Sequence, residues 1–117
     1  MACTAGLLCR AGVCGAMAAT WSTSATAYNC ATPGVIGTRV TFGCPPAGTA
    51  SAIWGTDVYT HDSSICTAAV HVGRITLATG GAVTIQMMAG QASYTASTRN
   101  GITSNPYGAW GCSFGIP

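Results

Sequence analysis

The stretch of sequence from Trp54 to Gly73 constrains the fold most, because it contains the most apolar helical run in the chain. Asp62 stands where an N-cap residue accepts hydrogen bonds from the first free backbone amides, and Gly73 stands where a left-handed residue ends a helix. The apolar residues follow the helical spacing i, i+3, i+4 and i+7: Ile65, Ala68, Ala69 and Val72. A helix that is apolar on nearly every side is normally buried. The sequence therefore predicts a central helix over about residues 63–72, with sheets packed around it.

Strand patterns surround this helix on both sides. Alternating or Thr-rich segments predict strands at 21–27, 38–42, 52–54, 58–59 and 113–116. Residues 75–88 predict a hairpin whose tight turn is Gly80-Gly81, with Val83, Ile85 and Met87 facing the core. Residues 89–111 predict a long polar loop, and a loop of that length is more often functional or self-packed than idle. The fold class predicted is α+β.

Seven cysteines in 117 residues favour an oxidising compartment and disulfide bonds. The odd number leaves at least one thiol unpaired or bonded to another chain. The sequence has no Cys-x-x-Cys pair, and His61 and His71 lie outside zinc-finger spacing, so we expect no metal site. Residues 1–20 lack the pattern of a signal peptide, and we expect the export signal to lie outside this sequence.

Charged residues are few, since the chain has no Lys and no Glu and a net charge of +2. Its four Arg residues are too scattered for a nucleic-acid surface. No stretch is long and apolar enough to span a bilayer. These observations exclude nucleic acid as a partner and a transmembrane segment.

The candidate acids and bases are Asp57, Asp62, His61 and His71. Asp62 is accounted for as a helix cap. His71 lies on the polar stripe of a buried helix, and we expect it to be a structural histidine that bonds a backbone carbonyl. Because two carboxylates and no Lys supply little for acid–base work, we expect a protein that is not an enzyme and uses no cofactor.

Many short motifs, in the right order, resemble the LCCL domain. They include Val58-Tyr59-Thr60, Asp62-Ser63-Ser64-Ile65-Cys66, Ala68-Ala69-Val70-His71-Val72-Gly73, Asn100-Gly101-Ile102 and Ser113-Phe114. The resemblance implies a central helix wrapped by two antiparallel sheets, in a non-catalytic module that is secreted. Trp54-Gly55-Thr56-Asp57 is most similar to bacterial secreted members. The resemblance divides the chain into a cysteine-containing arm or small cystine appendage at 1–19 and an LCCL-like domain at 20–117.

The family resemblance also bears on the disulfides. The family pairs the helix cysteine, here Cys66, with a cysteine just after a Cys-Pro turn, and that second cysteine is missing here. The resemblance then implies the pairs Cys30–Cys44 and Cys66–Cys112, each worth roughly 3 kcal/mol. The alternative for Cys66 is a buried free thiol. The partners of Cys3, Cys9 and Cys14 stay open.

Roles suggested for the family are binding of lipopolysaccharide or other surface carbohydrate, and adhesion. The candidate ligand-binding residues lie in the polar loop: Tyr94, Arg99, Tyr107 and Trp110. Sugars stack on aromatic faces, and Arg binds phosphate in a bidentate way. In the alternative interpretation the aromatic rings cover the core and Arg99 pairs with Asp57.

A structural role is the other hypothesis. Low charge, an unpaired cysteine and edge strands without Lys or Glu suit a subunit that binds copies of itself. The N-terminal arm and the edge strands would then build an extracellular filament or surface layer.

Overall fold

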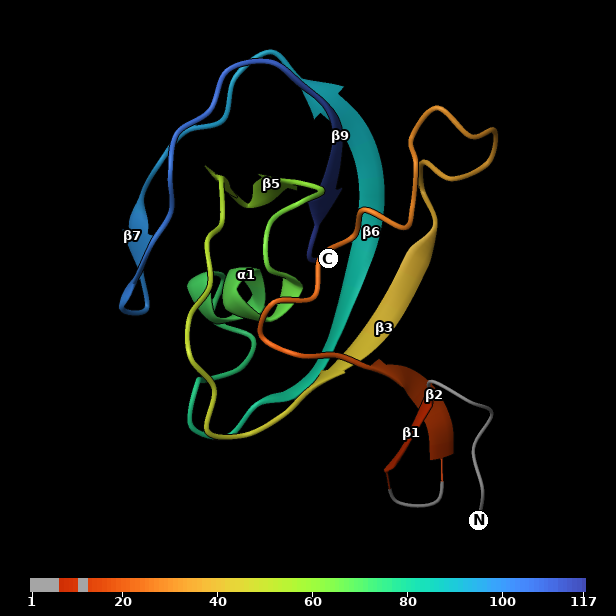
Figure 1. Ribbon diagram of the computed structural model, residues 1–117, viewed down its shortest axis with the longest axis vertical. Coiled ribbons are helices and arrows are strands. Elements are labelled where there is room, and N and C mark those ends of the chain that lie inside the picture. Colours follow the sequence, from red (N-terminus) through yellow and green to blue (C-terminus); the bar gives the residue numbers. More distant parts are fainter. Residues whose placement is uncertain (1–6, 11–12) are drawn as a thin grey trace.

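The computed structural model of the protein describes residues 7–10 and 13–117, and these form one helix and nine strands. Figure 1 shows the α+β arrangement, which confirms the predicted fold class. The elements are β1 (Leu7–Arg10), β2 (Val13–Ala18), β3 (Arg39–Cys44), β4 (Gly55–Thr56), β5 (Val58–Thr60), α1 (Ile65–His71), β6 (Gly81–Gln91), β7 (Thr98–Arg99), β8 (Ile102–Thr103) and β9 (Trp110–Gly115).

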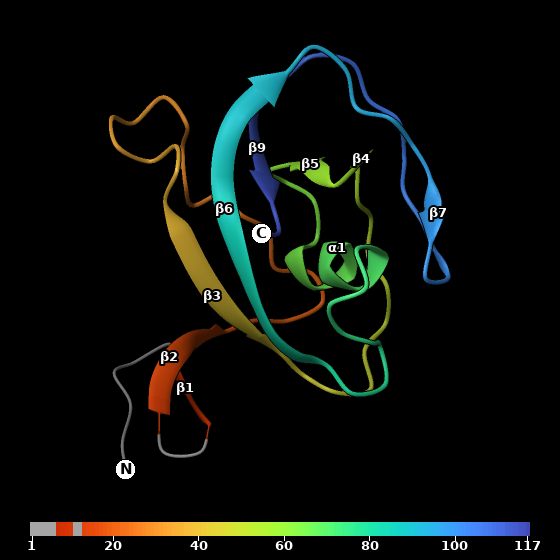
Figure 2. The same ribbon diagram turned by 180° about the vertical axis from the view of Figure 1, so that it is seen from behind.

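Seven of these strands form one sheet in the order β1-β2-β3-β6-β9-β5-β4, and β7 and β8 form a separate pair. Neighbours are antiparallel except β2 and β3, which run parallel at Met17↔Phe42 and Ala18↔Gly43. The expectation of purely antiparallel sheets is therefore wrong at this one pairing. The long strand β6 curves, and α1 lies on its concave side (Figure 2).

The helix is confirmed but shorter than predicted, and all seven of its residues are buried. Its N-cap is Ser64, whose side chain accepts a hydrogen bond from the backbone amide of Thr67. The predicted cap, Asp62, is wrong, because the helical backbone begins two residues later than the sequence pattern indicated. The C-terminus follows the prediction, since Gly73 has φ +88° and the amides of Gly73 and Arg74 close a Schellman motif on α1.

The predicted strand at 82–88 is confirmed within β6. Val83, Ile85 and Met87 are buried, while the residues between them are partly or fully exposed. On either side β6 pairs with β3 and β9, which place Phe42 opposite Val83 and Phe114 opposite Met87. This alternation builds the core between the sheet and α1. The strands expected at 38–42, 58–59 and 113–116 also exist as β3, β5 and β9.

Three predicted strand segments are wrong. Residues 21–27 form turns, because Ser and Thr side chains bond nearby backbone groups and because the backbone bonds elsewhere: the carbonyl of Thr23 accepts from Ile65 at the start of α1, and the amide of Ala25 donates to His61. Residues 74–78 also form turns, so 75–88 is no hairpin. Gly80 approaches the carbonyls of Cys44 and Pro45 so closely that a Cβ atom would collide with them, and the chain passes from there into β6. Over the strand expected at 52–54, Trp54 forms an isolated bridge with Asn105, and β4 begins only at Gly55.

The disulfides join Cys30 to Cys112 and Cys44 to Cys66. The predicted pairs Cys30–Cys44 and Cys66–Cys112 are wrong, and Cys66 is no free thiol. The physical reason is position: Cys44 ends β3 beside the buried helix that carries Cys66, with Cα atoms 5.8 Å apart. Cys30 lies beside β9 instead, 5.5 Å from the Cα atom of Cys112. The pairing of Cys3, Cys9 and Cys14 lies outside what the structure describes.

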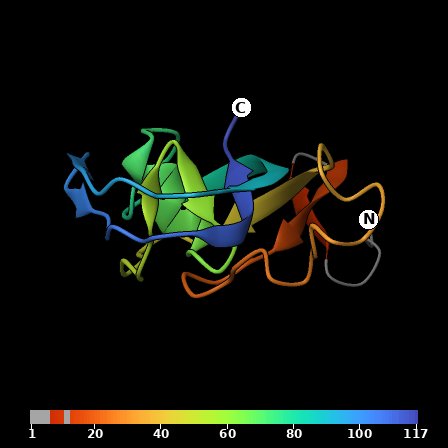
Figure 3. The same ribbon diagram turned by 90° about the horizontal axis from the view of Figure 1, so that it is seen from above.

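Within the predicted arm, β1 and β2 form an antiparallel hairpin that continues the sheet beyond β3. Figure 3 shows this hairpin and the β7–β8 pair at opposite ends of the molecule. The division of the chain at residue 19 or 20 stays a prediction.

Candidate functional site

The polar segment 89–111 is more ordered than a loop. β6 extends to Gln91, and Tyr94 and Tyr107 exchange two backbone hydrogen bonds of 2.8 and 3.1 Å. Beyond that bridge the chain forms the short β7–β8 pair. Asn105 then bonds the backbone of Ile53 and Gly55, which holds the returning segment against β4. The segment is thus fixed at three points before it enters β9.

Tyr94, one of the four predicted ligand-binding residues, is buried. Its hydroxyl accepts a hydrogen bond from the amide of Gln91 and donates to the carbonyl of Trp110 at 3.0 Å. It also contacts the Ser113 hydroxyl. Tyr94 therefore positions the start of β9, where Trp110 lies, rather than facing a ligand.

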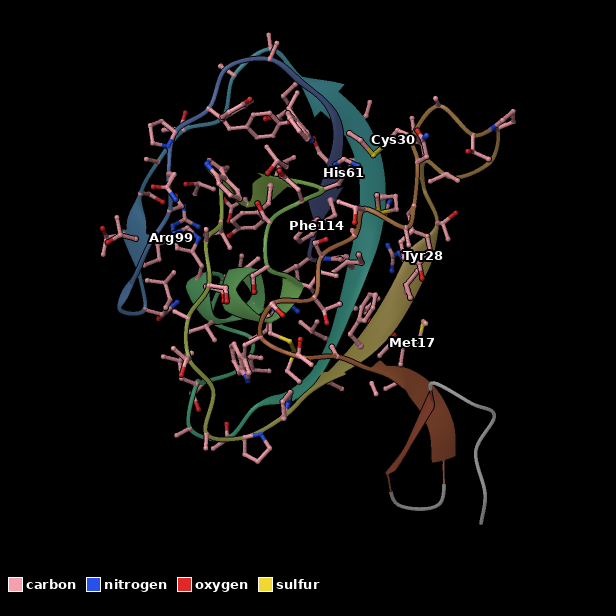
Figure 4. All side chains as sticks on the ribbon, in the orientation of Figure 1. Met17, Tyr28, Cys30, His61, Arg99 and Phe114 are labelled. Carbon is pink, nitrogen blue, oxygen red and sulfur yellow. A yellow bond between two sulfur atoms is a disulfide. The ribbon has the colours of Figure 1, made fainter. Side chains whose placement is uncertain are left out.

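Arg99, the second predicted residue, lies on β7 with its guanidinium 2.7 Å from the carboxylate of Asp57. The pair is exposed, so it contributes little to stability. This is the pairing that the alternative interpretation of the sequence described. Figure 4 shows Arg99 beside β7 and His61 beside β9, so the structure does not bring Arg99 to the aromatic residues described next.

Tyr107 and Trp110 do lie together, with ring centroids 5.5 Å apart in an edge-to-face arrangement. Trp110 donates a hydrogen bond from Nε1 to Nδ1 of His61 at 2.9 Å. Because Nδ1 accepts, the neutral ring carries its proton on Nε2. His61 is itself fixed, since its amide donates to the carbonyl of Cys112 and its carbonyl accepts from the amide of Ala25. The indole of Trp110 is therefore held in a set orientation.

A small hollow, which we call the aromatic pocket, lies on one side of Trp110. It is lined by Trp54, Thr60, Asp62, Tyr107 and Trp110 and has a volume of about 50 Å³. The backbone amide of Trp54 donates to the Ser63 hydroxyl, which ties that wall to the start of α1. Among the described residues, nothing hydrogen-bonds the buried Oδ1 atom of Asp62. The Asp62 side chain as a whole is partly exposed and lines the pocket, so the pocket suits a hydrogen-bond donor.

A second and wider hollow, which we call the disulfide groove, also borders Trp110. Its volume is about 440 Å³. It is lined by Thr26, Asn29, Cys30, Ala31, His61, Trp110, Gly111 and Cys112. Both cysteines of the Cys30–Cys112 disulfide are part of this lining, and the bond fixes the 26–31 segment against β9. The groove thus combines an aromatic wall with hydroxyl, amide and imidazole groups on a rigid base.

His71, by contrast, is buried in the interior and away from both hollows. Its Nδ1 atom lies 2.7 Å from the Tyr59 hydroxyl and its Nε2 atom 3.1 Å from the carbonyl of Ser97. The tautomer that satisfies both has Nε2–H donating to Ser97 and Nδ1 accepting from Tyr59. Burial raises the pKa of Tyr59 to about 12. His71 thus makes the carbonyl bond expected of a structural histidine.

Sequence reasoning missed Trp54, His61 and Asp62 as parts of a site. Trp110 and His61 are 49 residues apart in the sequence, and the pairing of β5 with β9 brings their neighbourhoods together. The sequence pattern assigns Asp62 to a helix cap instead. The sequence signal that could have indicated the site is the adjacent pair His61-Asp62, which lies just before the predicted helix and just after the segment that carries Trp54.

Among residues 7–10 and 13–117, no three His, Cys, Asp or Glu side chains gather as a metal site would require. No helix in that part of the chain has the length and apolar character needed to cross a membrane.

In the part of the chain that the structure describes, the fold is that of a small α+β module with a buried helix, two disulfides and surface hollows around one tryptophan. The chain belongs to the LCCL domain family, whose model matches residues 19–114. It is 42% identical to vitrin of Homo sapiens over 62 residues, which cover 53% of this chain and 9% of vitrin. It is 38% identical to cochlin of Cavia porcellus over 65 residues, which cover 56% of this chain and 12% of cochlin.

A third relative is the human cysteine-rich secretory protein LCCL domain-containing 2. It is 39% identical over 56 residues, which cover 48% of this chain and 11% of the relative. The chain thus matches about a tenth of the length of each relative. All three relatives are animal proteins.

Proposed function

We propose that this chain is a non-catalytic, secreted extracellular module that binds carbohydrate in the disulfide groove. The observation that carries the proposal is the orientation of Trp110, which is fixed by His61 beside a groove of about 440 Å³. That volume falls within the roughly 300–1,000 Å³ of small-molecule sites. The two disulfides support an oxidising, extracellular location.

The lining of the groove suits a sugar. Sugars present apolar C–H faces that pack on aromatic rings and hydroxyls that bond polar side chains. Trp110 supplies an aromatic face, while Thr26, Asn29 and His61 supply donors and acceptors. A surface polysaccharide therefore matches the groove better than an apolar ligand does.

Lipopolysaccharide is the other carbohydrate ligand to consider. Recognition of its phosphates would need a guanidinium, and Arg99 is paired with Asp57 at a distance from the groove. We therefore favour the sugar portion of a surface glycan as the ligand. Adhesion to cells through such a glycan is part of this proposal. The similarity of residues 54–57 to bacterial secreted members also remains a proposal, because the relatives above are animal proteins.

Binding measurements on two variants test the proposal. We expect Trp110→Ala to weaken binding of a surface oligosaccharide about tenfold or more, because stacking on an aromatic ring is lost. Arg99→Ala removes an exposed side chain outside the groove and should leave that affinity unchanged. Calorimetric titration with a neutral oligosaccharide and with lipopolysaccharide measures both. A loss with Arg99→Ala alone would place binding at β7 and contradict the proposed groove.

Self-assembly is the second candidate, and the place of β1 favours it. In the described part of the chain β1 is an edge strand of the seven-stranded sheet, and the sequence supplies no Lys or Glu to guard such an edge. A filament or surface layer built by edge pairing would give large species on native size-exclusion chromatography. A monodisperse monomer at high protein concentration would contradict it.

A further inference from the structure

We propose that the aromatic pocket binds the protonated amino group of an amino sugar whose ring lies in the disulfide groove. The inference rests on the proposed carbohydrate function and narrows the ligand to a glycan with free amino groups. It is carried by the size of the aromatic pocket, the place of Asp62 in its lining, the aromatic walls and the place of Trp110.

The size of the aromatic pocket limits its occupant to a single functional group. A volume of about 50 Å³ is far below that of a site for a whole small molecule. It has room for about three water molecules, or for a terminal group of similar size such as an ammonium. The sugar ring itself must then lie outside the pocket.

The charge of the pocket selects a cation that donates hydrogen bonds. Asp62 is the acidic residue in its lining, and its side chain is partly exposed. An ionised carboxylate only accepts hydrogen bonds, so its complement is a group rich in donors. An ammonium group supplies three such donors and the opposite charge. No Arg lines the pocket, and the chain contains no Lys, so the complement must come from another molecule.

The aromatic walls add to the same preference. Trp54, Tyr107 and Trp110 line the same pocket as Asp62, and the face of each aromatic ring is electron-rich. A cation held against such rings is attracted by their quadrupoles, most strongly when water is excluded. A neutral hydroxyl would gain the hydrogen bond but not this attraction. The pocket therefore discriminates an amine from a hydroxyl or an acetamide.

The place of Trp110 connects this pocket to the proposed sugar site. Trp110 lines both hollows, and the adjacent residues His61 and Asp62 line the groove and the pocket respectively. A ligand that contacts the indole in the groove is thus next to the pocket. A sugar that carries an amino group beside a ring hydroxyl has the two features that this pair of hollows requires.

The test compares two oligosaccharides of equal length, one of glucosamine and one of N-acetylglucosamine. At about pH 6 the free amino groups are protonated. We expect the full chain to bind the glucosamine oligomer about tenfold more tightly, as measured by calorimetry. Asp62→Asn, which keeps the side-chain shape, should abolish this difference.

Asp57→Asn is the matched control, because it removes the same charge from the other aspartate, which lies outside both hollows. It should keep the preference for glucosamine. Thermal melting of both variants checks the fold, and Asp62→Asn should melt close to the parent, since the buried Oδ1 atom has no hydrogen bond to lose among the described residues.

Each other outcome has a distinct meaning. Equal binding of the two oligosaccharides, lost in Trp110→Ala, would keep the proposed function and overturn the amino-sugar inference, leaving water as the partner of Asp62. Binding of neither oligosaccharide would overturn both. An Asp62-dependent affinity for a lysine peptide without affinity for sugar would assign the pocket to a protein partner and also overturn both.

Discussion

Tyr59 and His71 form a buried hydrogen-bonded pair, and the burial of Tyr59 makes the stability of the protein depend on pH. The pKa of Tyr59 is raised from 10.0 to about 12, mainly because burial disfavours the phenolate. The folded state therefore keeps a proton that the unfolded state loses above about pH 10. Stability from this group is fully present below that pH and is lost as the pH rises to about 12.

We predict that Tyr59 ionises well after an exposed tyrosine would. The difference in tyrosinate absorbance between the parent chain and Tyr59→Phe should have its midpoint near pH 12. Tyr59→Phe should also lower the free energy of unfolding by about 1–3 kcal/mol at neutral pH, because Nδ1 of His71 loses its donor.

The matched control for this change is Tyr107→Phe. The Tyr107 side chain is 46% exposed, and removal of its hydroxyl should leave the free energy of unfolding nearly unchanged. A midpoint near pH 10 for the Tyr59 difference would contradict the buried pair. So would equal stability of Tyr59→Phe and Tyr107→Phe in chemical denaturation.

At the scale of elements, the parts that could be predicted are those whose pattern depends on neighbours in the sequence. The alternation over 82–88 and the helical spacing over 65–72 are such patterns, and both led to the right element. Residues 21–27 show a similar strand-like alternation, yet their backbone bonds the start of α1 and adjacent side chains. No local sequence pattern predicts that the backbone of a segment will bond a distant element and nearby side chains rather than a neighbouring strand.

The candidate site shows the same limit. Tyr107 and Trp110 were found because aromatic residues in a long polar segment are distinctive. The sequence does not place Trp54, His61 and Asp62 at the same site, because the pairing of β5 with β9 is what brings them to Trp110. Arg99 was chosen by its chemistry, and its pairing with Asp57 depends on how the β7–β8 end folds back toward β4 and β5.

The disulfide pairing is likewise a property of how elements pack. Cys44–Cys66 ties β3 to α1 over a sequence separation of 22, and Cys30–Cys112 ties the 26–31 segment to β9 over a separation of 82. In the chain-entropy model these loops are worth roughly 3 and 4–5 kcal/mol respectively. The disulfide that closes the longer loop should therefore contribute more to the free energy of unfolding.

We predict that loss of the Cys30–Cys112 bond, in a Cys30→Ala/Cys112→Ala chain, costs about 1 kcal/mol more than loss of Cys44–Cys66 in the matched double variant. Denaturant unfolding of the two variants measures the difference. Peptide mapping under non-reducing conditions gives the connectivity directly. A cross-linked peptide that joins Cys30 to Cys44 would contradict the arrangement described above.

At the scale of the whole molecule, the core and the family match share nearly the same limits. The cluster of buried hydrophobic residues, with those packed against it, lies between Ala19 and Ile116 among the described side chains. The family model covers residues 19–114. The β1–β2 hairpin lies at one end and adjoins the rest of the sheet through only two residue pairs of β3. In the described part of the hairpin, Ala16, Met17 and Ala18 lie outside this cluster, so these residues extend the sheet without joining the core.

We predict that a chain beginning at Ala19 folds by itself. It loses the β2–β3 pairs Met17↔Phe42 and Ala18↔Gly43 and the contact of Tyr28 with Met17, but keeps both disulfides, α1 and the two hollows. Its free energy of unfolding should fall by only about 1–2 kcal/mol, and its transition should stay cooperative. Denaturant unfolding monitored by tryptophan fluorescence measures this, and oligosaccharide affinity should be unchanged.

Loss of the cooperative transition would show that the hairpin is part of the folding unit and would contradict the division of the chain near residue 19. If the full chain forms large species and the shortened chain is monomeric, the hairpin carries assembly while the domain carries binding.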